Sequence, residues 1–337
     1  MFKFLILASA VVILYRIFLR EDDFDLPKKG ITEIKKVKRV IEDKEDYVEV
    51  QRTSGLFHKI PFCEIIKAGP RKDGIPTIDK PKFISFECAD KFLNSFDQGI
   101  AIKFDGVSRF YPLKILMWHQ VVNDIIGNKR VLVSYCPLCF TGTVFNPIVG
   151  GEQTEFGTSG RVWNSNLLIY DRKTQSLWSQ ISGEAICGRM TGSRLSKIYC
   201  EQITYAGFKK NFPKGEILSR KTGFFRFYDE NPYHEYHLAS EVFFPIKKKD
   251  ERLPNRDLIF GITFGDIAKA YSLSKLREER IIKDSFANKK IVAKYNNDTG
   301  AASLFEEHPQ KGLIKLSATL GFWFSWVAIY PQTELYK

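Results

Sequence analysis

The sequence predicts an α+β protein, rich in β-strands, with two pseudo-symmetric copies of a hairpin–helix–strand unit and an N-terminal membrane anchor. Three observations predict this fold class: an internal repeat, the strand-forming residues within it, and an apolar N-terminus. The chain has 337 residues, of which 44% are apolar and 14% aromatic. This is enough material for one large core or two cores, and it suits packed β-structure better than disorder.

The internal repeat is the most informative of these observations. Residues 102–113 align with residues 262–273, and the alignment continues without a gap through Phe145 and Phe305. The identical pairs are Ile102/Ile262, Phe104/Phe264, Tyr111/Tyr271, Leu113/Leu273, Leu116/Leu276, Asp124/Asp284, Asn128/Asn288, Lys129/Lys289, Tyr135/Tyr295 and Phe145/Phe305. Chance gives only a few identities over such a stretch, so we infer that one folding unit was duplicated.

Each copy predicts the same local structure. In copy one, short strands over 101–104 and 108–111 flank an Asp105-Gly106 turn, which is a strong hairpin signal. Pro112 is then expected to begin a helix over 113–126, which Gly127 ends. Further strands are predicted over 131–135, 143–145, 167–170 and 176–180.

The N-terminal residues 1–20 predict a membrane anchor or signal. The apolar run from Phe4 to Leu19 is slightly short for a full span and is interrupted by Arg16, which can snorkel to the interface. We favour an uncleaved anchor over a cleaved signal peptide, because the small residues of the run lie too early for a cleavage site. The body is then expected outside the cytoplasm, on the periplasmic or extracellular side. Residues 21–56 are highly charged and predict a polar tether that can form a helix around 31–41.

The net charge of +12 comes from basic residues that are scattered along the chain. No base-reading motif accompanies this charge, so we expect no nucleic-acid partner. A basic run that begins at Lys35 lies close to the apolar N-terminus. Attraction to anionic lipid is therefore the better interpretation, and the membrane is the expected partner.

The two copies, expected over 57–220 and 221–337, differ in the character of their helices. The helix predicted over 113–126 is apolar on nearly all sides, which indicates burial. Its counterpart carries four charged residues over 277–280 and must face water on at least one side. Copy two is therefore assigned a structural role.

A second difference concerns sulfur. The segment Cys136-Pro137-Leu138-Cys139 of copy one is replaced by residues 296–299, Asn-Asn-Asp-Thr, in copy two. Our hypothesis is that Trp118, His119 and the cysteine pair line one site, which copy two lacks. Simple divergence of unrelated surface positions is the alternative.

Two cysteines at this spacing serve two chemistries. They form a reversible dithiol/disulfide, or they supply two thiolates to a metal such as zinc or copper. In the first case Cys136 is the nucleophilic thiol, Cys139 the resolving thiol and His119 the proton acceptor. In the second, Cys136, Cys139 and His119 are metal ligands, and Met117 would suit copper. A redox or metal-delivery partner would then be needed, and its identity is unknown.

A purely structural role, as disulfides or as buried free thiols, is an alternative for all six cysteines. The pair at 136 and 139 is equally explained by a structural disulfide or two buried thiols. Cys63 with Cys88, or Cys187 with Cys200, can form further disulfides, and free thiols are again the alternative.

Polar residues near Trp163 and Trp178 predict a ligand pocket, or else turn caps and surface pairs. The expected ligand-binding residues are Trp118, Arg161, Asn164, Asp171, Arg172 and Glu184. They support two alternatives to a thiol or metal-thiolate centre. One is a non-catalytic ligand-binding or scaffold module with a structural cysteine pair. The other, the weakest, is a hydrolase-like enzyme that uses Arg161, Asp171 and Glu184.

Two histidines, His234 and His237, have a spacing that suits one helical face. The neighbouring Pro232 and aromatic residues favour a surface loop instead. No phosphate-binding loop, dinucleotide fingerprint or nucleophile elbow occurs in the sequence. Whether the chain is an enzyme therefore stays open.

Several segments fall in order along the chain and together carry a family resemblance. They are residues 69–76, Tyr111-Pro112-Leu113, Trp118-His119, Asn123-Asp124, residues 134–139, residues 156–160, Asn164-Ser165, Tyr170-Asp171-Arg172 and residues 183–186. Together they resemble the domain-of-unknown-function family numbered thirty-one seventy-nine. The resemblance covers roughly Phe57 to the C-terminus, and it is specific because so many segments match in order. It implies a bacterial or archaeal protein, often exported or anchored, and it implies no established reaction.

Overall fold

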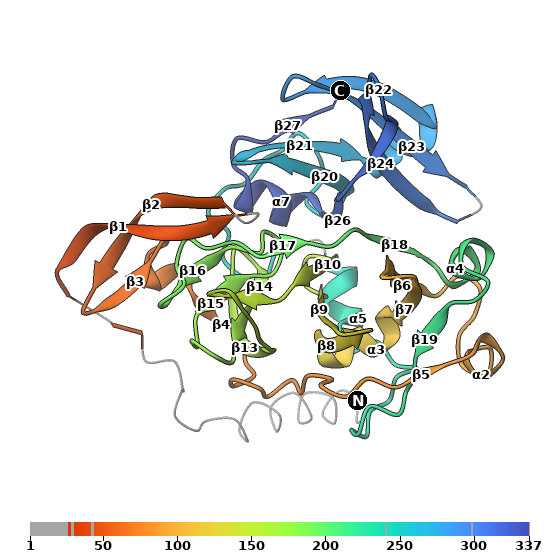
Figure 1. Cartoon of the computed structure of the whole chain (residues 1–337), viewed down its shortest axis with the longest axis horizontal. Helices are drawn as coiled ribbons and strands as arrows, with labels where there is room; N and C mark the ends of the chain where they lie inside the picture. Colours follow the sequence, from red (N-terminus) through yellow and green to blue (C-terminus); the bar gives the residue numbers. More distant parts are fainter. Residues whose placement is uncertain (1–25, 28–29, 42–43, 240, 298, 337) are drawn as a thin grey trace, which may run out of the picture.

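The structure, a computed structural model, describes residues 26–27, 30–41, 44–239, 241–297 and 299–336. The anchor predicted over 1–20 lies outside these residues. Among the described residues, none of the helices has the length and apolar character needed to cross a membrane. The described chain is rich in β-strands, as predicted, and most of its short helices follow directly on a strand (Figure 1).

Copy one is built from two sheets. The first has the strand order β18-β6-β7-β19-β5 and the second the order β17-β10-β9-β8. Their strands are β5 (Phe83–Ile84), β6 (Gln98–Phe104), β7 (Val107–Pro112), β8 (Val121–Ile126), β9 (Lys129–Cys136), β10 (Thr141–Asn146), β17 (Ser196–Lys197), β18 (Cys200–Thr204) and β19 (Glu216–Leu218). The accompanying helices are α2 (Phe86–Ala89), α3 (Leu113–His119) and α4 (Tyr205–Asn211).

Copy two repeats this plan with the strand orders β26-β20-β21-β27 and β22-β23-β24-β25. The four sheets of the two copies form a propeller-like arrangement. The strands are β20 (Leu258–Phe264), β21 (Ile267–Ser272), β22 (Ile281–Phe286), β23 (Lys289–Asn296), β24 (Ala301–His308), β25 (Gly312–Leu316), β26 (Thr319–Phe322) and β27 (Glu334–Leu335). The helices of this part are α5 (His234–Leu238), which precedes the copy, α6 (Leu273–Glu279) and α7 (Trp323–Ile329).

The duplication extends to the last strand of each copy. In copy one, α4 leads into β19, which pairs in parallel with β7. In copy two, α7 leads into β27, which pairs in parallel with β21. Both copies therefore share a hairpin, a helix, a meander and a final parallel strand, and copy one carries an additional insertion.

An eight-stranded sheet of order β1-β2-β3-β16-β15-β14-β13-β4 takes four strands from the insertion, which lies between β10 and β17, and four from residues 32–67, which precede the two sheets of copy one. Figure 1 shows this sheet beside copy one and below copy two. Its elements, together with a separate two-stranded ladder and one 3-10 helix, are β1 (Thr32–Ile41), β2 (Lys44–Thr53), β3 (Leu56–His58), η1 (Phe62–Glu64), β4 (Ile66–Lys67), β11 (Ile148–Val149), β12 (Glu152–Gln153), β13 (Phe156–Trp163), β14 (Asn166–Asp171), β15 (Leu177–Ser179) and β16 (Ala185–Cys187).

The prediction of a helix around 31–41 is wrong. Residues 32–41 form β1, which pairs with β2 at the edge of the eight-stranded sheet, so much of the tether expected over 21–56 is sheet. Ile34 and Val37 are three residues apart and imitate a helical stripe. The segment is also rich in β-branched residues, which favour a strand once a partner strand is present.

The helix predicted over 113–126 is also too long. It ends at His119, because Gln120 takes a left-handed conformation with φ 61°, and β8 begins at Val121. Arg280 takes the same conformation in copy two, with φ 65°. The continuous apolar run therefore reflects a buried helix followed by a buried strand. Gly127, expected to end the helix, lies in the turn between β8 and β9.

A carboxylate on β8 ties the first sheet of copy one to the second. Asp124 Oδ2 accepts a hydrogen bond of 2.6 Å from the Tyr111 hydroxyl and pairs with Arg109 Nη1 at 2.6 Å. Arg109 Nε reaches Glu216 on β19 at 3.2 Å. The side chains of Asp124, Arg109 and Glu216 thus join β8, β7 and β19.

Copy two repeats this cluster. Asp284 Oδ2 accepts from the Tyr271 hydroxyl at 3.0 Å and pairs with Lys269 Nζ at 2.6 Å, while Lys269 reaches Glu334 at 3.3 Å. Because these residues are kept in both copies, we assign them to the scaffold. Residues present in one copy only are the better candidates for function.

This assignment predicts unequal losses of stability. Asp124 is buried, whereas Asp284 is more exposed. Removing one partner of a buried ion pair strands the other charge, so Asp124→Asn is expected to lower the free energy of unfolding by about 3 kcal/mol. Asp284→Asn is expected to cost somewhat less, about 2 kcal/mol, because Asp284 keeps 16% of its side-chain surface exposed and water partly screens its charge. Urea denaturation of both variants measures this, and equal losses contradict the interpretation.

Candidate functional site

The cysteine pair lies in the hairpin loop between β9 and β10. Cys136 is the last residue of β9 and faces Thr141, the first residue of β10. Both cysteines are fully buried, with 0% of their surface exposed. All six cysteines, each in the described part of the chain, are free thiols, so none of the three disulfides considered from the sequence is formed.

Polar groups surround both sulfurs. Asn166 Nδ2 donates to Cys139 Sγ at 3.0 Å, and the Thr141 hydroxyl lies 2.9 Å from the same sulfur. The backbone N–H of Leu167 donates to Cys136 Sγ at 3.3 Å. The buried side chain of Gln180 accepts from Thr141 at 2.8 Å and from Asn166 at 3.0 Å. The insertion therefore supplies the groups that hold the thiols of the repeated hairpin.

This environment shifts the pKa values of the two thiols in opposite directions. Burial raises the pKa of Cys136 well above its usual value, and its hydrogen bond to Cys139 raises it further. Burial also raises the pKa of Cys139, but its hydrogen bonds with Cys136, Thr141 and Asn166 outweigh burial and lower that pKa. The sulfur that favours the thiolate is thus Cys139, whereas the sequence led us to assign this role to Cys136.

A cover over the cysteine loop comes from residues 233–237, in and just before α5. The Tyr236 hydroxyl donates to the carbonyl of Leu138 at 2.8 Å, and His237 Nε2 donates to the carbonyl of Pro137 at 2.8 Å. Tyr233 accepts a hydrogen bond from Gln120 at 2.8 Å. The segment forms a short helix rather than the surface loop expected from the sequence.

Tyrosine hydroxyls therefore enclose the pair. Burial raises the pKa values of Tyr135, Tyr233 and Tyr236, and the neighbouring cysteine pair adds to the shift. Among the described residues, the buried hydroxyl oxygen of Tyr135 has no hydrogen-bond partner. The sequence analysis missed these tyrosines. Only the aromatic residues around His234 and His237 pointed to this segment.

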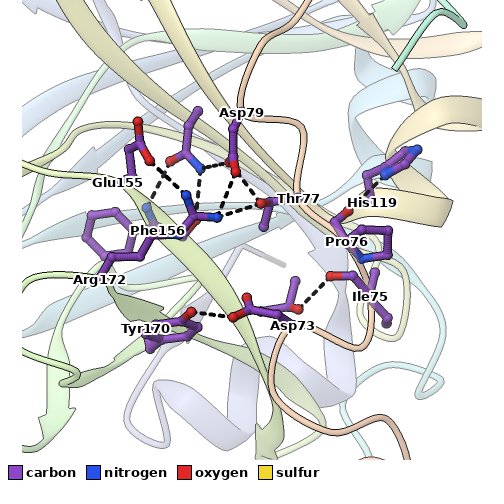
Figure 2. A network of polar contacts seen from close by, with 12 residues as sticks. Asp73, Ile75, Pro76, Thr77, Asp79, His119, Glu155, Phe156, Tyr170 and Arg172 are labelled. Atoms are coloured by element: carbon purple, nitrogen blue, oxygen red, sulfur yellow. Dashed lines mark hydrogen bonds and ion pairs between the residues drawn. The ribbon is translucent and has the colours of Figure 1, made fainter. Parts of the chain in front are cut away.

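His119 is engaged away from the sulfurs. Its Nδ1 donates to the carbonyl of Pro76 at 2.8 Å, which leaves Nε2 to accept from the Tyr228 hydroxyl at 2.7 Å (Figure 2 shows the bond to Pro76). Burial lowers the pKa of His119 to about 4, so the ring is neutral. Throughout the described ranges, no group of three or more His, Cys, Asp or Glu side chains could hold a metal ion. The expected zinc or copper site of Cys136, Cys139 and His119 is therefore not assembled.

The ligand residues expected from the sequence are not gathered in one pocket either. Arg172 pairs with Glu155 at 2.7 Å and with Asp79 at 2.9 Å (Figure 2). Asp79 also accepts from Asn123 on β8 at 2.7 Å. This network fixes the segment around Thr77 against copy one, which is a structural role.

Other members have separate partners. Asp171 accepts from the Trp178 indole at 2.9 Å and from the Thr174 hydroxyl at 2.7 Å, and so shapes the loop before β15. Glu184 pairs with Lys59 and, at 3.5 Å, with Arg194.

Nor do the remaining candidates share a centre. Asn164 donates to the carbonyl of Ala328 at 2.9 Å, and Trp118 donates to the carbonyl of Glu230 at 3.3 Å. Arg161 is buried on β13 near Cys187. No contact joins Arg161, Asp171 and Glu184 into the centre that the hydrolase alternative requires, among the interactions described for them.

Comparison with known families decides the classification. A family model described as "Protein of unknown function (DUF3179)" matches residues 72–333. The chain belongs to this family. The resemblance inferred from the sequence is thereby confirmed, and the match spans both copies as well as the insertion. No curated protein and no solved structure gives a significant match.

The environment of His119 predicts a pH dependence. A histidine with a pKa of about 4 when folded and 6.5 when unfolded binds its proton more weakly in the folded state. Its contribution to stability is therefore present above pH 6.5 and is lost as the pH falls from 6.5 to 4. Wild-type protein is expected to lose roughly 2 kcal/mol more between pH 7 and pH 5 than His119→Gln does, measured by urea denaturation. Parallel losses in the two proteins contradict a neutral, buried ring.

Proposed function

We propose that Cys136 and Cys139 form a thiol–disulfide redox centre in the body of the protein. The observation that carries this proposal is a pair of free thiols three residues apart in one hairpin loop, each held by hydrogen-bonding groups: Asn166 and Thr141 at Cys139 Sγ, and the Leu167 N–H at Cys136 Sγ. Thiolate nucleophilicity in exchange reactions is greatest for a thiol whose pKa lies near the ambient pH. The hydrogen bonds to Cys139 Sγ lower the pKa of this thiol and so favour its thiolate.

The proposed reaction begins with attack by the Cys139 thiolate on one sulfur of an incoming disulfide. A Cys139–sulfur bond forms, the S–S bond of the substrate breaks, and the first substrate thiolate leaves. Cys136 then gives up its proton and attacks Cys139 in the mixed disulfide, which releases the second substrate thiolate. The pair loses two electrons, the substrate gains them, and the two protons of the pair end on the released thiols at low pH or in the solvent.

Burial of both sulfurs gives the cover a role in this scheme. The contacts of Tyr236 and His237 with the loop carbonyls hold the cover in place. An incoming disulfide reaches Cys139 only when these two hydrogen bonds break. The cover would thus slow the reaction of the centre with small disulfides and favour partners that displace it.

A count of thiols in unfolded protein tests the proposal. Reduced wild-type protein is expected to show all six thiols. After equilibration with an excess of glutathione disulfide, two thiols are expected in an internal disulfide, and glutathione adducts on the exposed Cys63 and Cys88 are counted separately by mass spectrometry. Dithiothreitol should restore the two thiols. Cys136→Ser and Cys139→Ser should each abolish this reversible internal loss of two thiols.

Cys187→Ser is the matched control, because Cys187 is buried and its pKa is raised to about 12, first of all by burial. This variant should keep the loss of two thiols. An unchanged count of six in oxidised wild-type protein contradicts the proposal. So does a stoichiometric metal ion in protein purified without chelator, since it assigns the thiolates to a metal.

We also propose that the chain is anchored by its apolar N-terminus with the body outside the cytoplasm. The support is the apolar run from Phe4 to Leu19, followed directly by charged residues. An external body is consistent with thiol chemistry, because disulfides persist in oxidising compartments.

Fractionation of cells tests this location. Full-length protein is expected in the membrane fraction after alkaline carbonate washing, and its body should be cut by protease added to spheroplasts. A variant lacking residues 2–20 should be soluble and protected from the protease. Full-length protein that washes off the membrane, or that resists the protease, contradicts the proposed location.

A further inference from the structure

A cavity of about 730 Å³ lies between the insertion of copy one and the first sheet of copy two. Its volume falls in the range of small-molecule binding sites. One wall is formed by Lys59, Ile60, Trp163 and seven residues between Ser182 and Lys197. The opposite wall consists of residues 262–266 from the hairpin of β20 and β21, Leu316, Ser317, Ile329 and Tyr330. Figure 1 shows β17 between these two parts of the molecule.

The lining of the cavity combines apolar walls with an excess of positive charge. Three basic residues face two acidic ones: Lys59, Arg194 and Lys197 against Glu184 and Asp266. Glu184 is paired with Lys59 and Arg194, and Asp266 is paired with Arg194 at 2.5 Å.

Of the three basic residues, Lys197 takes no part in these ion pairs. No carboxylate of the described chain pairs with it, and its Nζ has only a long contact of 3.5 Å with the Thr319 hydroxyl. Burial, and secondarily the charge of Arg194, lower the pKa of Lys197 to about 8. A protonated amine in this position lacks the anion that would compensate its desolvation.

We propose that the cavity binds a small organic monocarboxylate, whose carboxylate pairs with Lys197 and whose apolar part packs against the walls. One unpaired positive charge matches one carboxylate. The walls favour an apolar body over a free phosphate, because they include Ile60, Trp163, Ile186, Leu195, Phe264 and Leu316. Tyr330 also lines the cavity, and none of the described residues forms a hydrogen bond with its hydroxyl.

This proposal gives copy two a role beyond structural support. Its β20–β21 turn and the residues around Ser317 complete a site that the insertion alone leaves open. The cysteine pair does not line the cavity, so the proposal is independent of the thiol chemistry.

Ligand-observed NMR on the folded chain tests the inference with benzoate, hexanoate and neutral benzamide as probes. Wild-type protein is expected to bind benzoate and hexanoate at least tenfold more tightly than benzamide. Lys197→Met should weaken both carboxylates about ten- to hundredfold and leave benzamide unchanged, because it removes only the charged hydrogen-bond donor. Lys290→Met, at an exposed position of β23 outside the cavity, is the matched control and should bind as wild type does.

A second variant keeps the test decisive if Lys197→Met fails to fold. Ser317→Trp places an indole in the cavity from an exposed position of copy two and should abolish binding of all three probes. Cys139→Ser should leave binding intact. The inference is overturned if wild-type protein binds neither carboxylate, if Lys197→Met binds them as tightly as wild type, or if Ser317→Trp still binds them.

Discussion

Asp124 receives a tyrosine hydroxyl and a guanidinium on one carboxylate oxygen, and Asp284 receives a tyrosine hydroxyl and an ammonium in the same way. Each carboxylate therefore fixes the angle between the two sheets of its copy, since its partners come from a strand of the other sheet. A buried charge requires such partners, and losing either one leaves the other unsatisfied. This constraint explains why four polar positions persisted through a duplication in which much of the surrounding surface changed.

The insertion places polar groups against the hairpin of copy one. Gln180 and Asn166 lie on this insertion, yet their hydrogen bonds end at Thr141 and Cys139 of the repeated unit. Amide groups that are buried without partners would be costly, so this network specifies the position of both sulfurs closely. The corresponding loop of copy two, residues 296–299, carries no sulfur. The proposed thiol chemistry would thus depend on the part that was added, although the sulfurs belong to the part that was copied.

The repeat could be predicted from aligned identical residues, and the first hairpin from its turn residues. Identities such as Tyr111 with Tyr271 identified the copies, and the Asp105-Gly106 turn located the first hairpin. The end of α3 could not be predicted, because the left-handed conformation of Gln120 has no sequence signal while an apolar run continues. The grouping of His119 with the cysteines failed for a related reason. Its partners, Pro76 and Tyr228, come from distant parts of the chain, and such contacts depend on sheet register and loop paths rather than on local spacing.

The position of β1 limits the distance between the folded body and the apolar N-terminal run. Because the ordered sheet already begins at Thr32, only about a dozen residues separate it from the end of the apolar run at Leu19. Even fully extended, a peptide of that length spans only about 45 Å. If this run anchors the body to a bilayer, the nearest strand of the body stays within that distance of the lipid surface. Any protein or metabolite that it meets must come within the same distance of the lipid, so its encounters would be nearly two-dimensional.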